Sequence, residues 1–181
     1  MNNEVILVNE KDEPVGSMEK LRAHQEGLLH RAFSVFILND AGEMLLQQRA
    51  QTKYHSAGLW TNACCSHPQP GEDTITSAVR RLQEELGFTT TLSPLFSFTY
   101  RSSFENGLIE HEYDHVFVGY HEGHINANPA EVMSVAYRSI EDIQQSLDSN
   151  PELYTTWFHI ALPMMAEWLQ QKMPASAGLI K

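Results

Sequence analysis

Apolar residues along the chain fall into short runs of the kind that form β-strands. Residues 31–38 and 43–49 are two such runs, and the turn-forming residues 39–42 between them predict a hairpin. In the run at residues 109–120, acids and histidines are set among apolar side chains. Together the runs predict strands at residues 5–8, 31–38, 43–49, 95–100 and 109–120.

Three segments carry the period of an α-helix. In residues 73–87 apolar side chains recur at spacings of three and four, and Gly87 stands where a helix end favours glycine. Residues 140–147 and 154–171 predict two more helices, and Pro163 is expected to bend the last one because proline removes a backbone donor. One stripe of that helix predicts core packing for Trp157 together with Leu153, Ile160, Ala161 and Met164.

Strands mixed with a few helices predict an α+β domain with a mixed sheet. The 181 residues fall within the usual size of one domain, and no repeat or Pro/Ser-rich linker divides them. We therefore expect a single domain over residues 1–181, with an N-terminal extension over about 1–29 and a frayed tail over about 173–181.

The chain is acidic, with 12 Lys and Arg against 23 Asp and Glu and a formal net charge of −11. This charge excludes nucleic acid as a partner, but local cations or metal ions can still bind a small anion. The N-terminus lacks the apolar run of a secretion signal, and no stretch is long and apolar enough for a membrane span. We therefore expect a soluble protein without a membrane partner. A disulfide between the adjacent Cys64 and Cys65 would be strained, which indicates a protein of the reducing cytoplasm.

A reactive segment surrounds the two cysteines. If residues 60–68 are extended, alternation puts Cys65 and His67 on one face and Cys64 on the other, so that thiol and imidazole share a pocket. The alternative is that both cysteines are inert core residues and His67 lies in a turn.

Two acids in the strand at 109–120 form a second cluster. Alternation puts Glu110 and Glu112 on the same face and His111 on the other. If buried, two like charges near 4 Å repel by about 4 kcal/mol at an effective dielectric of 20, and a cation or an added proton is required. The alternative is an ordinary solvent-facing strand edge.

His24 and His30 lie just before the first long strand. Together with His67 and the two acids they would suit a divalent ion such as manganese or zinc, although the spacing is too long-range to count as a motif. The helix at 73–87 carries Arg80 and Arg81 close to Glu84 and Glu85, which predicts ion pairs on a solvated face.

Taken in order, several segments resemble the type I isopentenyl-diphosphate isomerases, a Nudix-related family, over roughly residues 5–168. The segments that carry the resemblance are MEKLRAH from Met18, LHRAFSVFI from Leu29, LWTNACCSHPQPGE from Leu59, RRLQEELG from Arg80, the pair Tyr100-Arg101 and IEHEYDHVF from Ile109. The resemblance implies a Nudix-like mixed sheet between helices and an enzyme of isoprenoid biosynthesis that interconverts isopentenyl and dimethylallyl diphosphate.

Residues 66–88 look like an altered Nudix box. The matching positions are Glu72, Arg80, Glu84, Glu85 and Gly87. Ser66 stands in place of the first glycine of the box, and Arg81 replaces an acid with which Nudix hydrolases hold metal. The resemblance therefore points away from hydrolysis of the diphosphate.

The resemblance also implies roles for single residues. Cys65 and Glu112 would be the two acid/base groups on opposite faces of the substrate, with Tyr100 hydrogen-bonded near the glutamate. The manganese- or zinc-type ion would be bound by His24, His30, His67, Glu110 and Glu112. Glu85 and the backbone carbonyl of Cys65 would help to hold a magnesium ion. The diphosphate would be bound by Lys20, Arg49, Lys53 and Arg81, and Trp157 would stabilise a carbocation.

Two other classes of function remain open at this stage. A Nudix hydrolase would release phosphate with magnesium, and a binding module would hold a diphosphate without turnover. In each case the expected partner is a small diphosphate, and for the isomerase it is an isoprenoid diphosphate. We expect a monomer, with a homodimer as the alternative.

Overall fold

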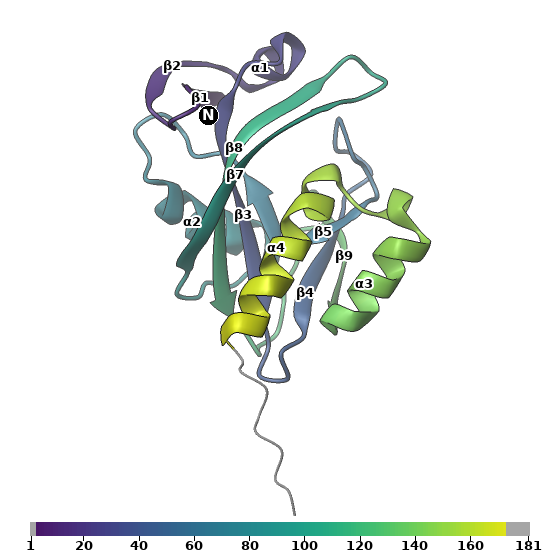
Figure 1. The fold of residues 1–181 in the computed structure, drawn as a ribbon. Helices are drawn as coiled ribbons and strands as arrows, with labels where there is room; N and C mark the ends of the chain where they lie inside the picture. Colours follow the sequence, from purple (N-terminus) through teal and green to yellow (C-terminus); the bar gives the residue numbers. More distant parts are fainter. Residues whose placement is uncertain (1–2, 173–181) are drawn as a thin grey trace, which may run out of the picture.

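The computed structural model describes residues 3–172, which form one mixed sheet with helices on both faces (Figure 1). The strands are β1 (Glu4–Val8), β2 (Pro14–Glu19), β3 (His30–Leu38), β4 (Met44–Arg49), β5 (Trp60–Asn62), β6 (Cys64–Ser66), β7 (Ser93–Ser103), β8 (Ile109–Tyr120) and β9 (Val132–Arg138). The helices are α1 (Lys20–Glu26), α2 (Thr74–Leu86), α3 (Ile140–Ser149) and α4 (Thr156–Lys172), with the short 3-10 helix η1 (Pro151–Leu153) before α4.

The α+β prediction and the mixed sheet are confirmed, and the centre of the sheet is β3. This strand runs parallel to β8 and antiparallel to β1, β4 and β6. Residues 32–38 are all buried because both faces of the strand are covered.

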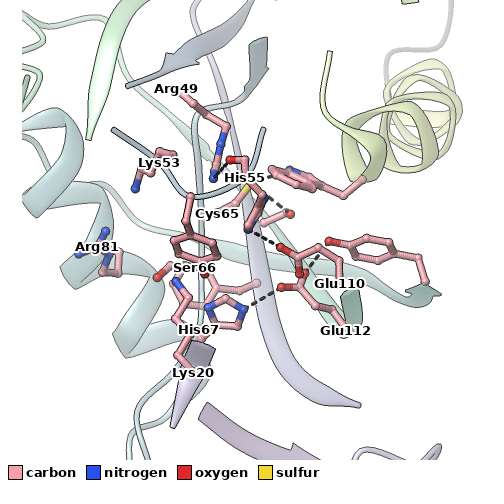
Figure 2. A pocket seen from close by; sticks show the side chains of 15 residues that line it. Lys20, Arg49, Lys53, His55, Cys65, Ser66, His67, Arg81, Glu110 and Glu112 are labelled. Carbon is pink, nitrogen blue, oxygen red and sulfur yellow. Dashed lines mark hydrogen bonds and ion pairs between the residues drawn. The ribbon is translucent and has the colours of Figure 1, made fainter. Parts of the chain in front are cut away.

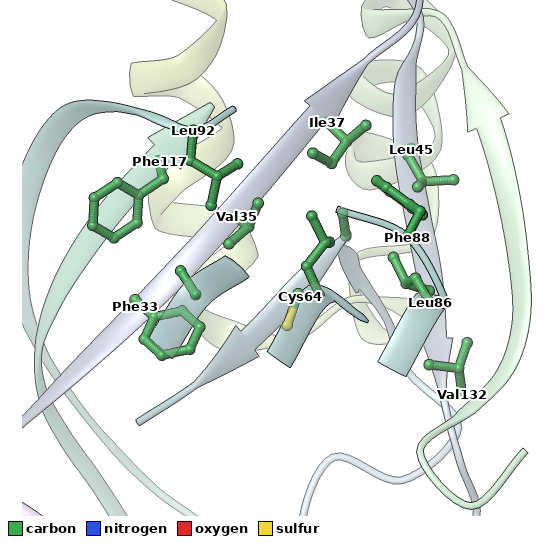
Figure 3. Close-up of a cluster of buried hydrophobic side chains, with 13 residues drawn as sticks. Phe33, Val35, Ile37, Leu45, Cys64, Leu86, Phe88, Leu92, Phe117 and Val132 are labelled. Atoms are coloured by element: carbon green, nitrogen blue, oxygen red, sulfur yellow. The ribbon is translucent and has the colours of Figure 1, made fainter. Parts of the chain in front are cut away.

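Alternation along β3 divides the core into two layers. Phe33, Val35 and Ile37 pack towards α2 together with Cys64 from β6 (Figure 3). Phe36 and Leu38 face the other way, into a layer closed by α3 and α4. The sheet is thus buried between helices on both faces.

The hairpin predicted at residues 39–42 joins the expected strands, but its ladder is short. β3 and β4 pair at Leu38 and Met44, beside the turn. Beyond that point β3 pairs with β6 and β8, while β4 pairs with β5 and β9. The two strands separate because each finds another partner, and β5 and β6 lie between them.

Helix α2 has the ends that its sequence predicts. The Asp73 carboxylate accepts a hydrogen bond from the Thr76 amide at 3.2 Å, which caps the first turn. Gly87 ends the helix with a φ of 77°, and a Cβ there would lie 2.7 Å from the Asn126 carbonyl oxygen. Glycine is therefore required by both conformation and space.

The stripe predicted for the last helix is partly wrong: Trp157 and Ala161 are buried as predicted, but its other three members are exposed. α4 begins at Thr156, so Leu153 lies outside it, and Ile160 and Met164 are 37% and 36% exposed. The core-facing side chains are Phe158, Ala161, Leu162 and Met165. Trp157 is 3% exposed, but it lines a cavity. Pro163 lies within the helix, and its predicted bend stays a prediction.

Residues 4–26, assigned from sequence to an N-terminal extension, form β1, β2 and α1, and β1 joins the sheet through Leu7 and His30. Helix α1 was not predicted because it has only seven residues. Its first turn is capped by the Glu19 carboxylate, which accepts from the amides of Leu21 and Arg22. The predicted frayed tail at 173–181 lies outside the described residues.

Candidate active site

One cavity brings together most of the candidate residues from the sequence (Figure 2). Its lining comes from β3, β4, β6, β7 and β8, and α1, α2, α4 and the loop between β4 and β5 each contribute side chains. The lining includes the cationic residues Lys20, Arg49, Lys53 and Arg81, the polar residues His55, His67, Cys65, Glu110 and Glu112, and the aromatic residues Tyr54, Tyr100 and Trp157.

Three histidines and two glutamates form a compact cluster beside this cavity. Each of His24, His30, His67, Glu110 and Glu112 offers one ligand atom, and all five atoms lie within 4.8 Å of one another. The parallel register of β3 and β8 sets His30 opposite Glu112, and α1 adds His24. The tertiary structure thus assembles a set that is scattered over 89 positions of the sequence, from His24 to Glu112.

The hydrogen bonds of two of these rings fit a metal ligand set. His24 Nδ1 lies 2.7 Å from the Lys20 carbonyl oxygen, and His30 Nδ1 lies 2.8 Å from that of Leu28. Because a carbonyl oxygen only accepts, each neutral ring carries its proton on Nδ1 and turns the Nε2 lone pair towards the cluster.

Unpartnered atoms in the cluster support the same interpretation. His24 Nε2 and Glu110 Oε2 are buried 3.4 Å apart, and neither has a hydrogen-bond partner in the described structure. Buried polar atoms are normally paired. Three imidazoles and two carboxylates suit a borderline divalent ion, so the residues present fit such an ion.

The cluster holds both glutamates in the ionised form. Burial opposes the charge of Glu110, but the neighbouring His24 and His55 rings outweigh it, and the pKa of Glu110 lies well below its usual value. Burial and the Glu110 charge raise the pKa of Glu112, but His30 and His67 lower it by more. The pKa of Glu112 therefore lies below its usual value. Burial lowers the pKa of His67 to about 3, with help from the Lys20 charge.

Glu112 has a fixed orientation. Its Oε1 atom lies 2.7 Å from His67 Nε2, and its Oε2 accepts a 2.8 Å hydrogen bond from the Tyr100 hydroxyl. Burial raises the pKa of Tyr100 well above its usual value, so the phenol stays protonated and can donate this hydrogen bond. The carboxylate is thereby held from both sides.

Cys65 and Cys64 point to opposite faces of β6, as alternation predicts. Cys64 is fully buried in the core, whereas Cys65 lines the cavity together with His67 (Figures 2 and 3). The Cys65 thiol donates to Asn62 Oδ1 at 3.0 Å, and Trp157 Nε1 donates to its sulfur at 3.1 Å. Burial raises the pKa of Cys65 to about 12, with help from the Asp114 charge, so the thiol is protonated at neutral pH.

Asn62 explains why the thiol points as it does. Its amide nitrogen donates to the carbonyls of Val35 and Cys64, at 3.0 and 3.1 Å. The amide oxygen is left to face the Cys65 thiol. The Asn62 side chain therefore links β6 to β3 by hydrogen bonds and also orients the Cys65 sulfur.

The four cationic residues are held by different contacts. The Arg49 side chain donates to the carbonyls of Ser56 and His55, at 3.2 and 3.3 Å. Lys53 forms an ion pair with Glu131, and Arg81 contacts the same carboxylate at 3.2 Å. Lys20 lies over the Tyr54 ring, with its nitrogen 5.4 Å from the ring centroid.

The predicted ion pairs on α2 are present, and they extend beyond the helix. Arg80 binds Glu84 at 3.0 Å and also Glu72, at 2.7 Å. Arg81 contacts Glu84 at 2.7 Å and the buried Glu85 at 2.6 Å. Gln47 also donates to Glu85, at 3.0 Å. The expected magnesium site at Glu85 and the Cys65 carbonyl stays a prediction.

Several residues of the site were not identified from the sequence. His55 and Tyr54 come from the loop after β4, while Ser34 and Asp114 lie on β3 and β8. His55 Nε2 lies 2.7 Å from Glu110 Oε1. Asp114 follows Glu110 and Glu112 in the same alternation, which is the one sequence signal that marks it. The loop residues carry no periodic signal.

Solved structures of low sequence identity share the fold. The protein DR0079 from Deinococcus radiodurans superposes with a TM-score of 0.75 at 20% identity, covering 89% of this chain and 98% of its own. A MutT protein from Methanosarcina mazei gives a TM-score of 0.64 at 19% identity, over 78% of this chain and 96% of its own. The family described as NUDIX domain matches residues 28–158. The chain is therefore a NUDIX-domain protein.

Relatives of higher identity narrow this assignment. An isopentenyl-diphosphate Delta-isomerase of Pectobacterium atrosepticum is 50% identical over 167 residues, which are 92% of this chain and 93% of that protein. One from Burkholderia multivorans is 45% identical over 173 residues, which are 93% of this chain and 98% of that protein. Within the NUDIX-domain proteins, the chain belongs to the isopentenyl-diphosphate Delta-isomerase family.

In the described part of the chain, no helix is long and apolar enough to cross a membrane.

Proposed function

We propose that this protein interconverts isopentenyl diphosphate and dimethylallyl diphosphate by moving one carbon–carbon double bond. The observation that carries the proposal is that a half-buried thiol, Cys65, and a buried carboxylate, Glu112, line the same cavity. Lys20, Arg49, Lys53 and Arg81 contribute positive charge to that cavity, which suits a diphosphate.

The reaction requires one proton donor and one proton acceptor. The donor adds its proton to one carbon of the double bond, which leaves a tertiary carbocation. A C–H bond then breaks on a different carbon next to the cationic one. Its electron pair forms the new double bond, and the proton goes to the acceptor. In the free protein the Cys65 thiol is protonated and Glu112 is ionised, so one of the two groups carries a proton and the other is free to accept one. The opposite direction of the reaction exchanges the two roles.

Two aromatic residues support the charges that develop. The Trp157 indole is almost fully buried, lines the cavity and contacts the Cys65 sulfur. Its ring already lies 5.2 Å from one cation, the Arg49 guanidinium, and would stabilise a carbocation by the same kind of contact. When desolvated, such a cation–π contact contributes up to about 2 kcal/mol. Tyr100 holds Glu112 in place by its 2.8 Å hydrogen bond. Because water would capture the carbocation, a closed and largely dry cavity is required.

A manganese or zinc ion at His24, His30, His67, Glu110 and Glu112 would supply positive charge that tunes the acidity of Glu112. The five clustered ligand atoms and the lone pairs of His24 and His30 support this ion. A magnesium ion near Glu85 would neutralise the diphosphate. We further propose that the protein acts in the cytoplasm on this small substrate alone, as a monomer.

The test is incubation of the purified protein with isopentenyl diphosphate, magnesium and manganese in heavy water, followed by NMR. We expect dimethylallyl diphosphate and deuterium at the exchanged carbons. Release of inorganic phosphate or pyrophosphate without this product would instead indicate a hydrolase. Saturable binding without product or deuterium exchange would indicate a binding module.

A further inference from the structure

His55 is a buried polar residue whose side chain reaches the candidate metal cluster from the loop between β4 and β5. It is 8% exposed, and its Nε2 atom lies 2.7 Å from Glu110 Oε1 (Figure 2). It does not belong to the group of five ligand atoms. Its contact is with a ligand of that group.

The two oxygens of Glu110 have different surroundings. Oε1 is bound by His55, whereas Oε2 lies 3.4 Å from His24 Nε2 and has no hydrogen-bond partner in the described structure. A carboxylate with one oxygen anchored is no longer free to rotate, and its other oxygen points in a fixed direction. Here that direction is into the cluster.

The ring of His55 is itself held on several sides. It stacks on Phe104 with ring centroids 5.0 Å apart, and it lies nearly perpendicular to the Trp157 ring, with centroids 6.1 Å apart. Its Nδ1 atom lies 3.3 Å from the Ser56 hydroxyl, which donates to it when the ring carries its proton on Nε2. The contacts leave the Nε2–H group directed at Glu110.

We propose that His55 is a positioning residue of the metal centre, whose Nε2–H group holds one oxygen of Glu110 so that the other faces the ion. The inference rests on the metal site of the proposed function. Outer hydrogen bonds of this kind orient the ligands of metal centres, and their loss weakens metal binding by about 10- to 100-fold. His55 thereby carries part of the affinity without contacting the ion.

Two substitutions separate the hydrogen bond from the packing of the ring. His55→Phe keeps an aromatic ring against Phe104 and removes the donor. His55→Gln loses the ring and keeps an N–H donor at nearly the same reach. The measurement is the Kd for Mn²⁺ of metal-stripped protein, from the free ion seen by electron paramagnetic resonance, together with the Tm of each stripped variant.

We expect His55→Phe to raise the Kd by about 10- to 100-fold and His55→Gln to recover most of the affinity. A control is His159→Phe, which keeps a ring on α4, removes the nitrogen that contacts the Pro151 carbonyl and should leave the Kd unchanged.

An unchanged Kd in His55→Phe would overturn the proposal. So would equal weakening in both variants with a lowered Tm, because that result assigns His55 to packing alone. If the unsubstituted protein bound no Mn²⁺, the five-residue ligand set would fall together with this inference. A protein that binds Mn²⁺ as expected but fails the isomerase test would leave the role of His55 standing.

Discussion

Tyr100 and Glu112 lie opposite each other on the paired strands β7 and β8, and the Tyr100 hydroxyl donates to Glu112 Oε2 at 2.8 Å. Both side chains are buried. The antiparallel register thus delivers a neutral donor to the carboxylate that we propose as an acid/base group. The bond fixes that carboxylate relative to the cavity.

Tyr100→Phe should lower kcat more than it changes KM, because the hydroxyl contacts the carboxylate and not the cationic residues. Hydrogen bonds to charged groups contribute about 1.5–3 kcal/mol, which corresponds to a loss of about 10- to 100-fold. Steady-state kinetics measures the effect. Tyr137→Phe is the control, since the Tyr137 hydroxyl donates to the His121 carbonyl outside the cavity. Equal effects in both variants would contradict the prediction.

Cys65→Ala and Glu112→Gln should each nearly abolish interconversion, because each removes one of the two proton-transfer groups. Circular dichroism should show an intact fold. Cys64→Ala is the matched control: Cys64 is the neighbouring cysteine, packed in the core, and its loss should cost stability on the order of 1 kcal/mol with activity retained. Full activity of Cys65→Ala would refute the mechanism.

Ser34→Ala should destabilise the protein. The Ser34 hydroxyl donates to Asp114 Oδ2 at 2.7 Å, and Asp114 Oδ1 is already without a hydrogen-bond partner in the described structure. Removing the donor leaves a buried carboxyl unsatisfied, at a cost of about 1–3 kcal/mol. Denaturant unfolding measures it, and Ser97→Ala, at an exposed hydrogen bond, should have little effect.

The pair Glu72 and Arg80 should make a stabilising contribution that depends on pH. Hydrogen bonds from Arg80 lower the pKa of Glu72 from 4.5 to about 2. A lowered folded-state pKa means that the contribution is present above about pH 4.5 and is lost as the pH falls through about 2. The free energy of unfolding of Glu72→Gln should therefore approach that of the unsubstituted protein on acidification. A difference that stays constant down to about pH 2 would contradict this.

Removal of metal by a chelator should lower both activity and Tm. Without a cation, the ionised Glu110 and Glu112 repel each other in a buried site. A ligand present at about 100 times its Kd stabilises the folded state by about 2.7 kcal/mol, so the shift in Tm should be readily measured. Added Mn²⁺ or Zn²⁺ should restore both quantities. Metal-free protein with unchanged activity and Tm would exclude the proposed ion.

The sequence by itself determined the longer helices and strands and the facing of several strand side chains. The period of α2 and its capping residues Asp73 and Gly87 predict the helix, because these are local effects of spacing and backbone conformation. Alternation likewise separated Cys65 from Cys64, and Glu110 and Glu112 from His111. The family resemblance rests on the same local segments.

Tertiary structure decided which of these side chains meet. His30 reaches Glu112 because β3 and β8 are parallel neighbours, and that pairing joins residues 82 positions apart in the chain. The stripe predicted for the last helix failed at Ile160 and Met164, because burial depends on the surface that α4 covers, which its own period does not specify. His55 lies on a loop without periodicity, so its contact with Glu110 follows only from the path that the folded chain takes.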